Sequence, residues 1–143
     1  MVGIQVQRVT EHALPVPARE SADAAGYDLR STLKWVLYPG EQKPIPTGFA
    51  WAIPRGFVGL IRDRSGLAVR NRVTTVAGVI DADYRGEVCA VMVNDGPDPL
   101  SIEPGDRIAQ IVVVPCLGMP CVETGALPET RRDVGGFGST GAA

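Results

Sequence analysis

The chain has 143 residues and a formal net charge of −2, so its length suits one domain with a core of its own. A charge this close to neutral gives no reason to expect a nucleic-acid partner, which usually requires a strongly basic surface. No apolar run approaches the roughly 20 residues that span a bilayer, and no N-terminal targeting signal is visible, so no membrane partner is expected.

Short apolar segments separated by turn signals run along the whole chain. They predict an all-β sandwich or barrel, and the 17 Gly and 12 Pro fit its many turns. Helical character is confined to Ser65–Asn71, where one short helix is expected. In chain order, the expected strands are residues 2–9, 35–38, 48–53, 57–61, 73–80, 88–93 and 108–114.

The cysteines and the histidine limit the chemistry. Three cysteines without zinc-type spacing favour reduced thiols in a cytoplasmic protein. The single histidine, His12, stands beside a proline-rich stretch, and we expect it to be exposed. Because Ser–His–Asp and Cys–His catalysis need a positioned imidazole, an enzyme of this sequence would have to use carboxylates and arginines.

The most informative segment is 78–86, where an apolar β-branched run ends at Asp81 and Asp83. Residues i and i+2 of a strand share a face, so both carboxylates could begin on one side. A turn at Ala82 and Asp83 would bring Tyr84 back near Asp81. One carboxylate beside one aromatic ring could activate a water and hold a small planar ligand. Asp83 is then better interpreted as a turn residue than as half of a catalytic pair.

Other segments carry groups suited to anions, although each alone is a weak signal. Residues 63–66 offer a guanidinium, a hydroxyl and a glycine amide in sequence, a compact cradle for an oxyanion. Residues 24–29 place Asp28 after an expected tight glycine turn, where it could orient metal-bound water or merely accept backbone amides. Residues 105–110 could be only a turn leading into a strand.

The C-terminal segment differs from the rest of the chain. It is rich in glycine, carries one aromatic residue, Phe137, and begins with the basic pair Arg131 and Arg132. It has too little apolar surface to form a core, while glycine lets a backbone approach a ligand closely. The sequence therefore predicts a β body over 1–130 and a flexible arm over 131–143 that closes on a ligand, rather than a frayed end.

Together, segments 25–29, 64–68, 78–86, 105–110 and 135–141 resemble, in this order, the five motifs of the trimeric dUTPase family. The resemblance spans nearly the whole chain. It implies a jelly-roll β-barrel that forms a homotrimer, with each active site built from all three subunits and the arm supplied by a neighbour. It also implies Mg²⁺-dependent hydrolysis of dUTP to dUMP and pyrophosphate, which lowers dUTP and supplies dUMP for thymidylate synthesis.

The resemblance also implies a role for each matching position. Asp81 would be the base that activates the water attacking the α-phosphorus, and Tyr84 would pack on the deoxyribose and exclude a 2′-hydroxyl. Asp28 would contact the water shell of a Mg²⁺ held mainly by the substrate. Uracil would be read by backbone groups of Thr75, Val79, Ile80 and Cys89. The phosphates would be bound by Arg64, Ser65, Gly66 and Gln110. In the arm, Arg132 would clamp phosphates, Phe137 would stack on uracil and Gly138 would also bind substrate.

The chain departs from the family pattern in three places. Asp63 stands where the family usually has proline, and Thr75 stands where many bacterial relatives have asparagine. Asp133 follows Arg132, where glycine is usual. Thr75 leaves open how one side of the uracil edge is read. Asp133 places a negative charge beside the arm arginine, so closure could be weaker and Arg131 could replace Arg132.

Two other functions stay open at this point. A dCTP deaminase shares the fold but needs a glutamate proton shuttle on the strand after the hairpin. That strand, 88–93, has no carboxylate, and Glu87 lies close to the turn. A dUTPase-like binding or regulatory protein is the second alternative, although the filled catalytic positions favour activity.

Overall fold

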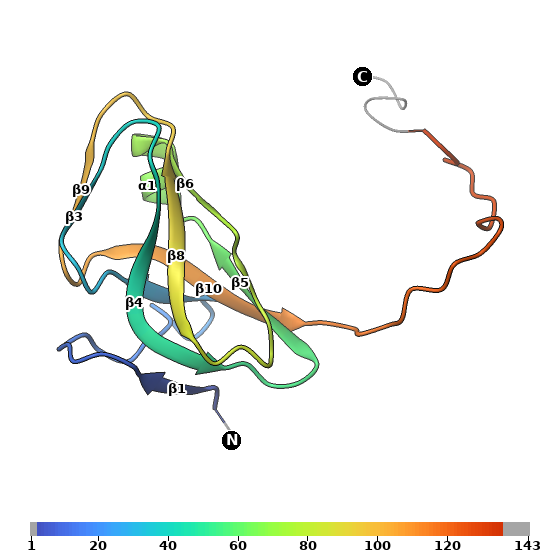
Figure 1. Ribbon diagram of the computed structural model, residues 1–143, viewed down its shortest axis with the longest axis horizontal. Coiled ribbons are helices and arrows are strands. Elements are labelled where there is room, and N and C mark those ends of the chain that lie inside the picture. The colour runs from blue at the N-terminus through green and yellow to red at the C-terminus, as the bar shows by residue number, and fades with distance from the viewer. Residues whose placement is uncertain (1–2, 136–143) are drawn as a thin grey trace.

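The computed structural model describes residues 3–135, and it is built almost entirely from antiparallel strands (Figure 1). One four-stranded sheet has the order β1-β4-β8-β6, a second has the order β2-β10-β5-β7, and β3 pairs with β9. The elements are β1 (Gln5–Arg8), β2 (Gly26–Arg30), β3 (Trp35–Leu37), β4 (Gln42–Ala52), β5 (Phe57–Arg62), α1 (Ser65–Asn71), β6 (Val73–Val76), β7 (Val79–Ile80), β8 (Glu87–Asn94), β9 (Leu100–Ile102) and β10 (Arg107–Pro115). The all-β prediction is confirmed, and two antiparallel sheets around one core fit a jelly roll.

The core lies between the two larger sheets and follows the alternation of the strands. Along β8 every second residue is buried, from Val88 to Asn94. Leu29 of β2 and Ile111 of β10 come from the opposite sheet and belong to the same buried core cluster as Trp51 of β4. No helix in the described part of the chain is long and apolar enough to cross a membrane.

The predicted strand 48–53 proves to be only the second half of β4. Pro44 and Pro46 are unusual in a strand that is paired on both sides, because proline cannot donate to a ladder. In the structure both lie in β4, opposite Val91 and Cys89 of β8. They are tolerated because β1 pairs only with Phe49–Ala52, so no strand requires a donor from the outer edge of β4 at these positions, where the Pro46 carbonyl accepts the Thr32 N–H.

The predicted single strand 73–80 is wrong, because the chain changes sheets in the middle of it. β6 joins β8 in the first sheet, whereas β7 joins β5 in the second. Ala77, at φ 53°, turns the chain between them. A Cβ on Gly78 would lie 2.6 Å from the carbonyl oxygen of Ile61, so glycine is required for this close approach. Because residues 73–80 are mostly apolar and β-branched, their sequence does not indicate the change of sheet.

His12 is half-buried, so the expectation of an exposed histidine is wrong. Its Nε2 lies 3.0 Å from the carbonyl oxygen of Gly48, and its ring meets Phe49 edge-on at 5.0 Å. Arg8 and the N–H of Leu14 both contact its Nδ1. The imidazole therefore ties the proline-rich entry segment to β4.

β10 ends at Pro115, and residues 116–135 contain no helix or strand. This segment leaves the barrel as an extended chain (Figure 1). Its large apolar side chains are at least 77% exposed: Leu117, Met119, Val122, Leu127 and Val134. A row of exposed apolar side chains is typical of a surface that packs against a partner.

Candidate active site

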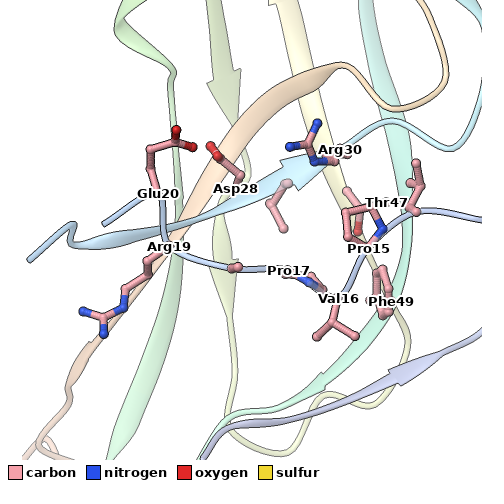
Figure 2. A pocket seen from close by; sticks show the side chains of 12 residues that line it. Pro15, Val16, Pro17, Arg19, Glu20, Asp28, Arg30, Thr47 and Phe49 are labelled. Carbon is pink, nitrogen blue, oxygen red and sulfur yellow. The ribbon is translucent and has the colours of Figure 1, made fainter. Parts of the chain in front are cut away.

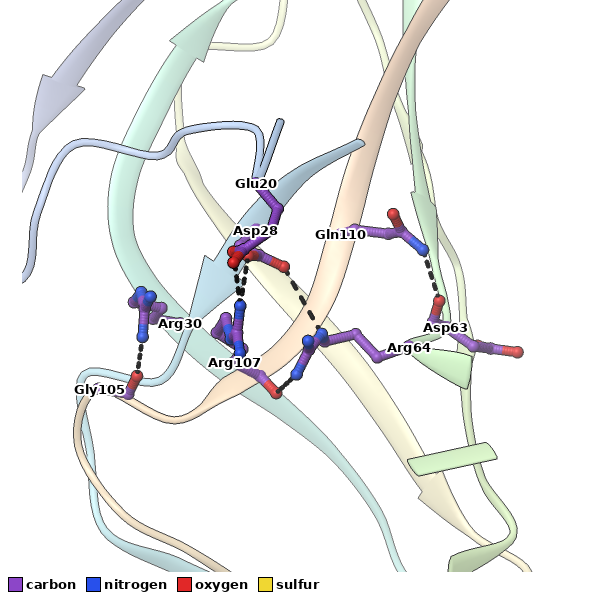
Figure 3. A network of polar contacts seen from close by, with 8 residues as sticks. All are labelled: Glu20, Asp28, Arg30, Asp63, Arg64, Gly105, Arg107 and Gln110. Atoms are coloured by element: carbon purple, nitrogen blue, oxygen red, sulfur yellow. Dashed lines mark hydrogen bonds and ion pairs between the residues drawn. The ribbon is translucent and has the colours of Figure 1, made fainter. Parts of the chain in front are cut away.

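Three neighbouring strands bring the first group of candidate residues together. Gln110 on β10 lies between Asp28 on β2 and Arg62, the last residue of β5. The chain then continues from Arg62 through Asp63 to Arg64. The Gln110 Nε2 donates a 2.9 Å hydrogen bond to the Asp63 carbonyl (Figure 3). Sheet register thus unites motifs that are far apart in sequence.

Gly26 makes room for Gln110. The sequence predicted a tight glycine turn before Asp28, and that prediction is wrong, because Gly26 is the buried first residue of β2 and pairs with Val112. A Cβ at this position would collide with the Gln110 side chain. Glycine therefore leaves the space that the Gln110 side chain occupies, and Asp28 is held on a strand rather than in a loop.

Asp28 lies between two guanidinium groups. Its Oδ1 is 3.5 Å from Arg64 Nε, and its Oδ2 is 3.4 Å from Arg107 Nη1. The same Arg107 nitrogen is 2.8 Å from Oε2 of Glu20 (Figure 3). Arg64 also donates to the Arg107 carbonyl at 3.2 Å. Forked guanidinium donors suit phosphate, which could take the place of these carboxylates as their partner.

These groups surround a cavity of about 340 Å³. Its lining includes Glu20, Asp28, Arg64, Ser65, Gly66, Arg70, Arg107 and Gln110. A second, smaller cavity of about 110 Å³ lies between the proline-rich segment and strands β2 and β4 (Figure 2). Glu20 and Asp28 line both cavities, so they stand where the two meet.

The second group of candidates lies in the turn after β7, residues 81–86, which is called the hairpin below although β7 and β8 belong to different sheets. The turn at Ala82 and Asp83 is confirmed, since the Tyr84 N–H donates to the Asp81 carbonyl at 3.2 Å. The Tyr84 hydroxyl donates to the Glu87 carbonyl at 3.1 Å, and its ring lies against Gly86, where a Cβ would collide with it. The exposed carboxylate of Asp81 makes no hydrogen bond or ion pair with any described residue.

Thr75 on β6 has both of its donors occupied. Its N–H and its hydroxyl donate to Oδ1 of Asp63 at 2.6 and 2.7 Å. What Thr75 still offers to a ligand on its side chain is a pair of hydroxyl lone pairs and a methyl group.

Cys89 and Glu87 stand next to the hairpin on β8. Partial burial, and then the negative charge of Glu87, raise the pKa of the Cys89 thiol, which keeps it neutral at physiological pH. The Glu87 carboxylate accepts the Gly48 N–H at 2.7 Å, where β4 and β8 shift register. Glu87 thus satisfies a backbone group of the sheet, which does not favour the shuttle that a deaminase requires.

Thiol labelling should reflect the protection of Cys89. Cys116 and Cys121 are exposed, whereas Cys89 is half-buried and its pKa is raised. Because the thiolate is the reactive form, a disulfide reagent at pH 7–8 should modify Cys89 much more slowly than it does in the unfolded chain. A Cys116→Ser/Cys121→Ser variant isolates this thiol. Equal rates in the folded and unfolded states would contradict the prediction.

The structure does not bring the two groups together within one chain. Ile80, just before Asp81, pairs with Gly59 near the start of β5, whereas Arg64 follows the far end of that strand. At about 3.3 Å per residue, the length of β5 separates Asp81 from Arg64 by roughly 15–20 Å. Asp81 lines a different hollow, which it shares with Phe57 and Cys116.

The arm residues are described only in part. Arg131 and Arg132 are exposed, and Arg132 Nε donates to the Gly135 carbonyl at 2.8 Å. Asp133 adopts a positive φ of 45°. The predicted ligands Phe137 and Gly138 lie outside the described residues.

Sequence reasoning missed Arg107 and Glu20. Arg107 lies three residues before Gln110 in a segment already singled out, so it could have been found there. Glu20 gave no local signal. It is 87 positions away from Arg107 in the sequence. The two residues meet at the cavity only because β2 and β10 are neighbours in the sheet.

Comparison with known proteins agrees with this arrangement. The dUTPase family model matches residues 12–141. The deoxyuridine 5′-triphosphate nucleotidohydrolase of Methylocella silvestris is 46% identical over 98% of this chain and 92% of its own length. The protein of that name from Caulobacter vibrioides is 48% identical over 90% of this chain and 86% of its own.

Solved structures show the same similarity. The dUTPase of Staphylococcus bacteriophage 80α with dUPNHPP superposes with a TM-score of 0.91 at 29% identity, covering 99% of this chain and 100% of that one. A dUTPase mutant from phage phi11 of S. aureus, described as revealing the coordination of a structural Mg(II) ion, gives a TM-score of 0.79 at 27% identity, covering 87% of this chain and 98% of that one. The chain therefore belongs to the dUTPase family.

Proposed function

We propose that this chain is a cytoplasmic enzyme that hydrolyses dUTP to dUMP and pyrophosphate, using Asp81 as the base and Mg²⁺ as the cofactor. The observation that carries the proposal is the cavity in which Asp28, Arg64 and Gln110 converge from three adjacent strands. The deaminase has less support because the Glu87 carboxylate accepts the Gly48 N–H. The binding or regulatory protein has less support because the similar proteins named above share the name of a hydrolase.

The arginines of this cavity would neutralise part of the negative charge of the substrate. A nucleoside triphosphate carries about four negative charges, which repel an attacking water until cations neutralise them. Arg64 and Arg107 are paired with Asp28 and Glu20, and a polyphosphate would exchange these carboxylates for its own oxygens. Ser65, Gly66 and Gln110 would add neutral donors along the phosphate chain.

Asp28 and Glu20 also fit a hard cation. Mg²⁺ prefers oxygen ligands and is usually held by one or two carboxylates, waters and substrate phosphates. No group of three or more candidate metal ligands occurs in the part of the chain that the structure describes, so this donor set suits a metal that arrives with the nucleotide. Bound there, the ion supplies charge neutralisation at the phosphates.

Asp81 would act on the water. Its free carboxylate accepts a proton as the water oxygen bonds to the α-phosphorus, and the bond to the bridging oxygen breaks to release pyrophosphate. Tyr84 would pack on the deoxyribose and exclude a 2′-hydroxyl. Backbone groups at Val79 and Ile80, with the neighbouring strands at Thr75 and Cys89, would read the uracil.

A shared site explains why the two groups lie apart. Asp81 and Arg64 occupy opposite ends of β5, so one chain cannot place both at one α-phosphorus. A homotrimer in which the hairpin of one subunit faces the cavity of the next would bring them together. Residues 116–130 could extend by up to roughly 50 Å and carry the arm at 131–143 to a neighbouring site.

A comparison of four nucleotides tests the proposed function. The purified chain with Mg²⁺ should release pyrophosphate from dUTP, and should use dCTP, dTTP and UTP poorly, because Tyr84 and the uracil contacts select sugar and base. Pyrophosphate release and ammonia release are measured in parallel. Equal rates on dTTP, or ammonia from dCTP, would overturn the assignment.

Deleting residues 131–143 should leave a folded trimer that turns over dUTP poorly. The last strand of the barrel ends at Pro115, well before the arm, whereas closure of the arm would exclude bulk water and bring Arg132 to the phosphates. Circular dichroism and sedimentation test the fold and the assembly, and steady-state kinetics test the arm. Unchanged kinetics would show that the segment has no part in catalysis.

A further inference from the structure

Two of the positions that depart from the family pattern contact each other. One carboxylate oxygen of Asp63 accepts both the N–H and the hydroxyl of Thr75. Asp63 lies in the segment that connects β5 of the second sheet to α1, whereas Thr75 belongs to β6 in the first sheet. The two unusual residues therefore form one interaction that joins the sheets beside the site.

Asp63 is held on its other side as well. Its carbonyl accepts the Gln110 amide at 2.9 Å. Figure 3 shows its side chain directed away from Gln110 and the ion pairs, and Asp63 does not line the phosphate cavity. Its negative charge is therefore turned away from the place where phosphates would bind and is satisfied by two donors.

Besides Asp63, the segment that follows it is held by the Arg64 side chain, which contacts Asp28 and the Arg107 carbonyl, and by the partly buried Leu67. Arg64 is the N-cap of α1, and its side chain makes no capping hydrogen bond. α1 has only seven residues and no buried side chain. The bonds made to Asp63 therefore fix the backbone immediately before Arg64, Ser65 and Gly66, where the helix itself supplies no capping bond and no fully buried side chain.

We propose that Asp63 is a positioning residue that sets the place of the phosphate-binding segment through its bonds to Thr75. The inference rests on the proposed function, since it assigns the segment to dUTP phosphates. It also gives Thr75 an indirect role, because its donors are used by Asp63 and not by uracil. In the proposed trimer the pair links the cavity of one active site to the base-reading strand of the next.

Kinetics of Asp63 variants test the assignment. Asp63→Ala should raise KM for dUTP roughly tenfold and change kcat little, because the loss of a charge-assisted bond displaces a binding segment and leaves Asp81 untouched. Asp63→Asn keeps an oxygen that can accept both donors and should restore most of the affinity. KM unchanged in Asp63→Ala, or no rescue by asparagine, would overturn the proposal.

Thr75 provides a second test and its own control. Thr75→Val removes the hydroxyl donor and should raise KM less than Asp63→Ala, because the backbone N–H bond remains. Thr74→Val makes the same change one residue earlier, on the other face of β6, and should have little effect. Asp63→Ala/Thr75→Val should resemble Asp63→Ala alone, whereas additive effects would show that the two residues act independently.

Hydrogen exchange separates this proposal from the proposed function. The Thr75 amide should be protected in the wild-type chain and lose protection in Asp63→Ala, with no substrate present. If protection is lost but KM is unchanged, the contact is only structural and the proposal fails. If the wild-type chain does not hydrolyse dUTP, the proposed function fails, whatever the exchange shows.

Discussion

Replacing Asp81 with asparagine is expected to lower kcat for dUTP by about 10²–10⁴-fold while dUTP still binds. Asparagine has nearly the same shape but cannot take a proton from water. The Asp81 side chain makes no hydrogen bond or ion pair with another described residue, so the exchange breaks no polar interaction of the fold. Its carbonyl still accepts the Tyr84 N–H, which keeps the turn in place.

Asp83→Asn is the matched control for this variant. Asp83 lies in the same turn, is also exposed and loses the same charge, yet it is interpreted as a turn residue. Its kcat should stay close to that of the wild type. Steady-state kinetics give kcat, and isothermal titration with a non-hydrolysable dUTP analogue gives the affinity.

The pair of results decides between two mechanisms. Loss of turnover in Asp81→Asn alone supports one oriented base. Equal losses in both variants would point to a two-carboxylate mechanism, and an active Asp81→Asn enzyme would place the base elsewhere. Weaker binding with kcat unchanged would make Asp81 a binding residue.

Local signals in the sequence predicted the parts of the site that depend on local structure. The helix at Ser65–Asn71 has the predicted bounds, and the turn after Asp81 forms at Ala82 and Asp83. Both depend on neighbours within a few residues. The order of the five motifs identified the family, because several ordered motifs are far more specific than any one of them.

Features that depend on partners distant in sequence could not be predicted in this way. Gly26 was expected to form a turn, but it lies on a strand and leaves room for Gln110 from another strand. The pair of Asp63 and Thr75 brings together two residues whose departures from the pattern seemed unrelated. Glu20 reaches Arg107 only through the order of strands in the sheet.

The change of sheet at Ala77 shows the same limit in the backbone. A continuous β-branched run favours one strand, and a non-glycine residue at positive φ is uncommon. The close approach of Gly78 to Ile61 makes the switch, and it places β7 on the edge of β5. This pairing sets Asp81 at one end of β5, which is the geometric reason to expect a shared site.

Mixing two inactive variants should restore activity if the site is shared. Asp81→Asn removes the base and leaves the cavity intact, whereas Arg64→Ala removes a phosphate ligand and leaves the hairpin intact. In trimers formed at random from equal amounts, about a quarter of the sites would combine an intact hairpin with an intact cavity from a neighbour. Co-refolded chains should therefore recover about a quarter of the wild-type turnover per site.

The control mixture uses two changes in the same group. Asp81→Asn and Tyr84→Ala both alter the hairpin, so every mixed site receives one damaged hairpin and gains nothing over the better parent. Native mass spectrometry establishes that mixed trimers form in both cases. Recovery with Arg64→Ala but not with Tyr84→Ala would show that the ends of β5 serve different active sites. Mixed trimers without recovery would mean that base and cavity act within one chain, against the separation that β5 imposes.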